Sequence, residues 1–248
     1  MADYKFPTEM VELPSKGYFY VDGHPLSEGK VEVKYMTARE EDILTSQNLI
    51  QQGIVIDKLL ESLIIDKSID IGDLLIGDKN AVMVAARILG YGKDYEFSYD
   101  GEEHKVDLSK LEPVDIDFSK FTRSVNEFSF ELPNSERTVT FKLLTGRDEK
   151  QIDAEIKAKQ KISKSQSSEL TTRLKTMILS IDGNSEKAYI NNFVDNEFLS
   201  RDSLAFRQYL SSITPDVDMT TKVVSSAGEE IEVTIPVTLR FFWPAAGV

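Results

Sequence analysis

Alternating apolar and polar residues predict short strands at several places along the chain. Residues 31–36 alternate as a half-buried strand does, and residues 230–235 repeat this pattern near the C-terminus. Residues 95–97 and 104–106 flank the turn pair Asp100-Gly101, which predicts a β-hairpin. We therefore expect strands both before and after the helical segments of the chain.

Helix signals fill the intervals between these strands. Thr37 occupies an N-cap position and Glu40, three residues later, completes a capping box, so a helix should follow directly. Apolar residues recur at helical spacing within residues 56–65. Asp78 is the expected N-cap of a further helix over residues 81–89, which ends at a pair of glycines.

The first 30 residues contain proline and glycine too often for a helix to develop. Turn residues are followed there by three β-prone aromatic residues, Tyr18, Phe19 and Tyr20. Two interpretations are open: a strand or hairpin packed on the first domain, or an arm that binds a partner. We treat residues 1–30 as an extended N-terminal arm, and its three aromatic residues as candidate partner contacts.

Residues 139–149 repeat the pattern of residues 31–41 at an offset of 108. Both segments specify a strand, a capping threonine and an acidic first helical turn, which suits the helix dipole. Five of the eleven aligned positions are identical: Val31 and Val139, Lys34 and Lys142, Thr37 and Thr145, Arg39 and Arg147, Glu41 and Glu149.

The correspondence continues downstream with offsets that grow in chain order. Residues 59–64 match residues 174–179 loosely at an offset of 115. Insertions in a duplicated unit would produce such growth, whereas the alternative is a coincidence of two similar capped helices. Further matches at offsets of 124 and 127 pair Leu75, Asp78 and Ala81 with Leu199, Asp202 and Ala205, and residues 101–103 with residues 228–230.

These observations predict an α+β fold with two duplicated strand–helices–β-hairpin units preceded by the extended N-terminal arm. The first unit with its linker covers residues 31–122, and the second unit covers residues 123–248. The second unit should differ by a longer first helix, from Asp148 to about Ile181, and by an aromatic C-terminal strand.

The end of the chain concentrates aromatic residues: Phe241, Phe242 and Trp243, the only tryptophan. Such residues either fill the core of their own domain or anchor a protein partner, because large aromatic side chains contribute strongly to interfaces. Both interpretations are open, and we include these three residues among the candidate partner contacts.

Composition excludes several classes of protein. The chain has 248 residues, no cysteine, and a formal net charge of −13. A cysteine-free chain has neither a disulfide framework nor a thiol nucleophile. The negative charge disfavours a nucleic-acid partner, since it repels a phosphate backbone. No run of 18 apolar residues is present, so no membrane partner is expected.

Candidate chemistry is sparse. His24 and His104 have no neighbouring ligand at metal-binding spacing, so we interpret both as surface residues. The acidic series from Asp66 to Asp78 lacks the spacing of a calcium loop. Phosphate-binding and hydrolase motifs do not occur. We therefore predict no catalytic residue, no metal site and no cofactor, and we do not expect an enzyme.

Five segments resemble the T-even-type bacteriophage baseplate protein family: residues 13–17, 35–46, 57–63, 73–81 and 241–244. The resemblance spans nearly the whole chain. It implies a component or assembly factor of the baseplate hub of contractile-tailed phages, in contact with other baseplate or tail proteins and open to self-association.

The same resemblance implies assembly in the host cytoplasm, and presence in the virion baseplate if the protein is retained. One alternative is a transient assembly chaperone that is absent from the mature virion. A tail-tip cell-wall hydrolase and a ring-forming sheath or tube adaptor are alternatives of other classes.

Overall fold

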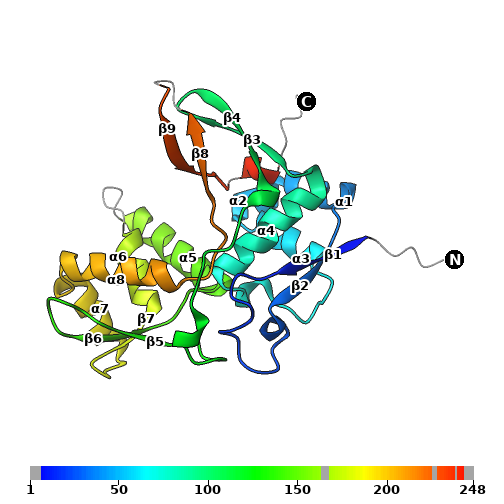
Figure 1. Ribbon diagram of the computed structural model, residues 1–248. Coiled ribbons are helices and arrows are strands. Elements are labelled where there is room, and N and C mark those ends of the chain that lie inside the picture. The colour runs from blue at the N-terminus through cyan, green and yellow to red at the C-terminus, as the bar shows by residue number, and fades with distance from the viewer. Residues whose placement is uncertain (1–6, 163–167, 225–227, 238, 243–248) are drawn as a thin grey trace.

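The computed structural model describes residues 7–162, 168–224, 228–237 and 239–242. Within these residues the chain has a mixed α+β fold, with eight α-helices and four small antiparallel sheets (Figure 1). We refer to residues up to 122 as the first half and to later residues as the second half. Helices of the described part lack the length and apolar character that crossing a membrane requires.

The first half opens with a two-stranded sheet. Strand β1 (Thr8–Glu12) pairs antiparallel with β2 (Lys30–Lys34), so the predicted arm contains a strand that is packed on the first half. After β2 come three helices, a short 3-10 turn and a long helix: α1 (Ala38–Thr45), α2 (Gln47–Gln52), α3 (Val55–Leu63), η2 (Ile71–Asp73) and α4 (Ile76–Tyr91). The expected hairpin follows as β3 (Asp94–Tyr99) and β4 (Glu102–Asp107), with Asp100 and Gly101 at positive φ in its turn.

The second half has a three-stranded sheet, and its elements alternate in a similar order. The strands β5 (Phe128–Glu131), β6 (Thr138–Phe141) and β7 (Ile178–Ile181) pair antiparallel with β6 in the centre. The helices are α5 (Gly146–Ile162), α6 (Glu169–Met177), α7 (Lys187–Asn196) and α8 (Ser200–Ile213). A second hairpin, β8 (Thr220–Val224) and β9 (Glu230–Thr234), precedes a final 3-10 turn, η5 (Leu239–Phe242).

Two sequence predictions about helices are wrong in detail. The single long helix expected from Asp148 to about Ile181 consists of α5 and α6, and its last four residues form strand β7. Ile178 and Ile181 are buried because they pair with β6, so sheet formation prevails over helical continuation there. Asp78 does not cap a helix: α4 begins two residues before it, and the carboxylate is buried in the first turn.

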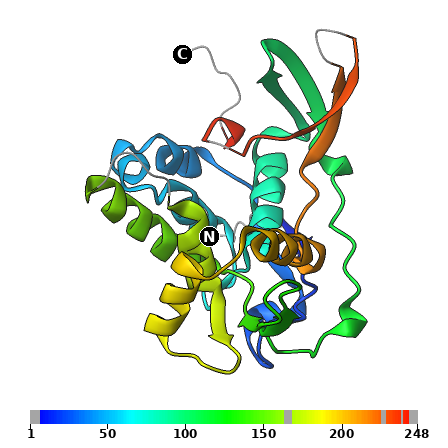
Figure 2. The ribbon, with the colours of Figure 1, turned by 90° about the vertical axis from the view of Figure 1, so that its left-hand side faces the viewer.

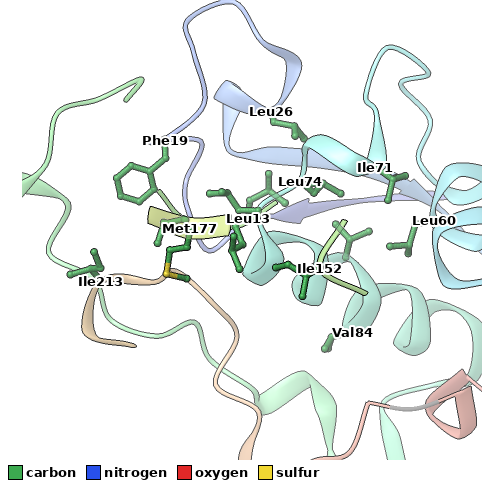
Figure 3. Close-up of a cluster of buried hydrophobic side chains, with 14 of the residues drawn as sticks. Leu13, Phe19, Leu26, Leu60, Ile71, Leu74, Val84, Ile152, Met177 and Ile213 are labelled. Atoms are coloured by element: carbon green, nitrogen blue, oxygen red, sulfur yellow. The ribbon is translucent and has the colours of Figure 1, made fainter. Parts of the chain in front are cut away.

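One cluster of buried apolar side chains extends through both halves (Figure 3). It includes Leu60 and Leu74 from the first half, with Ile152 and Met177 from the second. Fully burying a side chain of this size stabilises the fold by about 1.5–3 kcal/mol. The halves therefore share one core.

The two hairpins, β3–β4 and β8–β9, rise from the same end of the molecule in both views (Figures 1 and 2). Below them, η5 packs against the first half. The Phe241 ring lies 5.0 Å from the Tyr95 ring, and the Tyr95 hydroxyl donates a hydrogen bond to the Pro236 carbonyl at 3.2 Å. The end of the described chain thus closes back onto β3 and α4.

Candidate functional site

The start of α1 is organised around the carboxylate of Glu40, which is fully buried. Its Oε2 atom accepts hydrogen bonds from the Thr37 N–H at 2.9 Å and from the Thr37 hydroxyl at 2.6 Å. Its Oε1 atom accepts from Lys34 Nζ and Ser62 Oγ, both at 2.7 Å. Burial raises the pKa of Glu40, but these hydrogen bonds outweigh burial and hold it at about 2. One charged carboxylate thereby joins β2, α1 and α3.

The start of α5 has the same arrangement. Asp148 Oδ2 accepts hydrogen bonds from the Thr145 N–H at 3.0 Å and from the Thr145 hydroxyl at 3.1 Å. Lys142 Nζ lies 2.7 Å from Asp148 Oδ1, as Lys34 does from Glu40. The two threonines singled out in the sequence therefore lie at helix starts, each bonded to the acidic residue three positions later.

A second buried carboxylate, Asp78, fixes the loop after β1 to the start of α4. Asp78 accepts hydrogen bonds from the Ser15 N–H at 2.9 Å, the Ser15 hydroxyl at 2.6 Å and the Tyr20 hydroxyl at 2.6 Å. The Tyr20 hydroxyl in turn accepts from the Leu75 N–H at 2.8 Å. Burial raises the pKa of Asp78, and burial together with the nearby Asp78 carboxylate raises the pKa of Tyr20.

Asp202 occupies the corresponding place in the first turn of α8. It accepts hydrogen bonds from the Asn134 N–H and Nδ2, both at 2.8 Å, and from the Ser135 N–H at 3.1 Å. Burial raises the pKa of Asp202, but these donors outweigh burial and lower it below the ordinary aspartate value. In both halves, a buried aspartate thus ties the loop between two paired strands, β1–β2 or β5–β6, to the first turn of a helix.

The predicted contact residues near the N-terminus lie against the chain itself. Phe19 and Tyr20 are buried, and Tyr18 is partly buried with its hydroxyl donating to the Phe121 carbonyl at 3.0 Å. The Phe19 ring lies 5.1 Å from the Phe128 ring of β5. Tyr18 and Tyr20 therefore pack within the first half, and Phe19 connects the first half to the second.

The predicted contact residues near the C-terminus have a similar outcome. Phe241 and Phe242 are fully buried, which leaves no side-chain surface for a partner. In the structure, both phenylalanines fill the chain's own core, which is one of the two interpretations given above. Trp243 lies outside the described residues.

One contact between the two halves joins the start of α4 to the start of α5, and we call this contact the junction. Leu75 and Thr145 form an isolated antiparallel bridge. The Ile76 N–H donates to the Leu144 carbonyl at 3.2 Å, and the Gly146 N–H donates to the Leu74 carbonyl at 2.8 Å. Sequence reasoning missed the junction, because a bridge between two helix starts leaves no periodic pattern.

Charged side chains flank the junction. Arg147 donates to Asp70 at 3.0 Å and to Asp73 at 2.7 Å across it. Asp57 of α3 contacts Lys150 of α5 at 2.8 Å as well as Lys79 of α4 at 2.5 Å. Burial raises the pKa of Asp57, but the hydrogen bonds from the two lysines outweigh burial and lower it.

Two helix starts away from the junction have exposed residues in the described structure. Before and at the start of α8, residues 195–197 are exposed, and Leu199 is 51% exposed. At the start of α1, Ala38 and Arg39 are exposed. A groove of about 510 Å³ adjoins Arg39. Its lining includes Lys34, Arg39, Lys58, Lys67 and Glu61, of which Lys58 pairs with Glu61 and Lys34 pairs with Glu40.

The histidines and acidic residues form no metal site in the described part of the chain, where no group of three or more potential ligands comes together. His24 Nδ1 accepts a hydrogen bond from the Leu26 N–H at 3.2 Å, and its Nε2 lies 3.7 Å from Asp73. His24 therefore caps the short 3-10 helix η1 (Pro25–Glu28).

Comparisons of the chain with family models, with curated proteins and with solved structures found no match. The baseplate-family resemblance therefore rests on the sequence segments themselves. Residues 13–17 form the loop that Asp78 holds, residues 35–46 contain the start of α1, and residues 73–81 supply the first half's side of the junction.

Proposed function

We propose that the chain is a non-enzymatic structural or assembly protein of a phage tail baseplate hub, which scaffolds other hub proteins by protein–protein contact. The observation that carries this proposal is the position of the family-like segments. Residues 13–17 and 73–81 build the anchored loop and the junction. A scaffold must hold its contact surfaces at fixed separations; residues 13–17 fix the loop after β1 to the start of α4, and residues 73–81 join the first half to the second.

The proposal includes a duplicated architecture, which the element boundaries support. Helices α3 and α6 each have nine residues and begin 114 positions apart, one fewer than the offset suggested by sequence. Helices α4 and α8 begin 124 positions apart. Gly101 and Gly228, 127 positions apart, both have positive φ in hairpin turns.

Hydrogen bonding supports the duplication independently of element lengths. The Leu13 N–H donates to the Gly29 carbonyl, and the Leu132 N–H donates to the Arg137 carbonyl, both at 2.9 Å. The first bond closes the long loop between β1 and β2, and the second closes the short loop between β5 and β6. Asp78 and Asp202 each hold such a loop. The shared loop anchors favour the proposed duplication over a coincidence of two similar capped helices.

Affinity capture from infected cells tests the proposed function. A tagged chain, produced during phage infection and cross-linked before lysis, should capture other baseplate or tail proteins. A tagged acidic protein of similar size is the control. Capture of no tail protein above this control would contradict the proposal, and turnover of peptidoglycan by the purified chain would support the hydrolase alternative instead.

Mass spectrometry of purified tails separates the two versions of the function. A permanent hub subunit occurs in intact tails at a fixed copy number. A transient assembly chaperone occurs in assembly intermediates of the host cytoplasm and is missing from finished tails. Both versions require capture of tail proteins during assembly.

A further inference from the structure

The junction joins the start of α4 to the start of α5, and the reciprocal contact between the start of α8 and the start of α1 is not formed in the described structure. Leu75 at the start of α4 is 3% exposed and is bridged to Thr145 at the start of α5. The residues that would form the reciprocal pair, Leu199 and Thr37, are not bridged in the described structure, and Figure 1 shows the start of α8 and helix α1 on opposite sides of the molecule. Such a heterologous contact leaves one surface of each kind uncovered.

We infer that copies of this chain associate head to tail, with the start of α8 of one copy docked on the start of α1 of the next. We call residues 195–200 the tail edge and residues 36–39 the head edge. This inference rests on the duplication included in the proposed function, because it assigns to the contact between copies the geometry of the junction within one copy.

The backbone groups of the two edges match those of the junction. Ser200 and Ala38 are the first residues of their helices, so their N–H groups have no acceptor within the helix. In the junction, the equivalent N–H groups of Ile76 and Gly146 donate to carbonyls of the opposite half. Between copies, Ser200 would donate to the Met36 carbonyl, and Ala38 to the Phe198 carbonyl.

The side chains at the two edges are also complementary. Leu199 takes the position of Leu75, so docking would cover its exposed side chain. Arg39 takes the position of Arg147, which contacts Asp73 in the junction, and Glu197 takes the position of Asp73. Between copies, Arg39 of the head edge would thus face Glu197 of the tail edge, an arrangement that favours one docking orientation.

The junction and the contact between copies differ at one residue position, and this difference affects the strength of the contact between copies. A Cβ atom placed on Gly146 would lie 2.9 Å from the Ile71 carbonyl oxygen, and the head edge has Ala38 at this position. The copies must therefore sit slightly further apart than the two halves do. We expect an association that depends on protein concentration, and its heterologous geometry generates a ring or a filament.

Sedimentation velocity of the purified full-length chain over a concentration series tests the inference. The wild type should form species larger than a monomer as its concentration rises. Leu199→Glu and Arg39→Glu should each weaken this association at least about tenfold. Val224→Glu is the matched control, because Val224 is 59% exposed on β8 outside both edges, and it should associate like the wild type.

Mixing the two edge variants identifies the geometry. Leu199→Glu keeps an intact head edge and Arg39→Glu keeps an intact tail edge, so a mixture should form 1:1 dimers and nothing larger. Circular dichroism melting verifies that each variant is folded. A wild type that stays monomeric up to its highest soluble concentration, or a folded Leu199→Glu variant that associates like the wild type, would overturn the inference. Neither result would affect capture of other tail proteins.

Discussion

Leu75 and Thr145, 70 positions apart in the chain, form an antiparallel bridge that joins the starts of two helices. On each side, the helix start is itself held by a buried carboxylate, Asp78 in α4 and Asp148 in α5. The junction therefore connects two helix starts that are each held by hydrogen bonds within their own half. This relationship explains how two halves with separate sheets share one core.

The threonines at the helix starts contribute to stability through the acidic residue that follows each. We expect Thr37→Ala and Thr145→Ala each to lower the free energy of unfolding by about 0.5–2 kcal/mol, measured by urea denaturation. Thr45→Ala, at the exposed end of α1, is the control and should change it by less than about 0.5 kcal/mol. Equal losses in the free energy of unfolding at all three positions would show that the helix-start contacts do not cause the loss of stability.

Acid should weaken the fold through Glu40. The pKa of Glu40 in the folded chain is about 2, below its ordinary value of 4.5. The stabilisation by this carboxylate is therefore fully present above about pH 4.5 and is lost as the pH falls through about 2. Urea midpoints between pH 7 and 2 should fall more steeply for the wild type than for Glu40→Gln. Parallel curves of urea midpoint against pH for the wild type and Glu40→Gln would contradict this expectation. The exposed Glu12→Gln change serves as the control.

Tyr20 and Asp78 should be energetically coupled. Asp78→Ala leaves the buried donors of Ser15 and Tyr20 unsatisfied, and we expect a loss of about 1–3 kcal/mol in the free energy of unfolding. Tyr20→Phe removes one of these donors, so it should cost less when Asp78 is already absent. A double-mutant cycle measures this difference. Strictly additive losses would mean that the hydrogen bond between them contributes nothing.

At the junction, the close approach of the two backbones should contribute more to the stability of the fold than the ion pairs of Arg147 do. Gly146→Ala should destabilise the fold by about 1–3 kcal/mol, because the added methyl group meets the Ile71 carbonyl. Arg147→Ala should cost at most about 1 kcal/mol, since its ion pairs are largely exposed. Thermal unfolding of both variants gives the comparison. A stabilising Gly146→Ala change would argue against close approach at the junction.

The C-terminal phenylalanines should contribute to the stability of the fold. We expect Phe241→Ala to lower the free energy of unfolding by about 3–5 kcal/mol, because it empties a fully buried site beside Tyr95. Val237→Ala, at a partly exposed position just before η5, is the control and should have a small effect. Unchanged stability of Phe241→Ala would restore these aromatic residues as candidate partner contacts.

Local signals in the sequence predicted much of the fold. The strand predicted at residues 31–36 is present as β2, which ends at Lys34. The threonine at the start of α1 and the Asp100-Gly101 hairpin also follow from short patterns, and the structure contains both. Their positions depend on residues close in the chain, which explains the agreement. The mixed α+β class follows from the same signals.

Features that depend on distant residues were not predictable in this way. Residues 178–181 read as the end of a helix, but pairing with β6 makes them a strand. Asp78 read as a helix cap, whereas its partners are Ser15 and Tyr20, about 60 residues earlier. The junction and the burial of Phe19 and Phe241 likewise depend on how the halves pack. Tertiary contacts decided each of these positions.

The proposed role of this chain is to build a baseplate hub by protein–protein contact. Electron microscopy of particles from cells infected with a phage that lacks the chain tests it most directly, with the chain supplied from a plasmid as the control. We expect complete baseplates to be absent without the chain and restored by the plasmid. Complete baseplates in normal number without the chain would contradict the account.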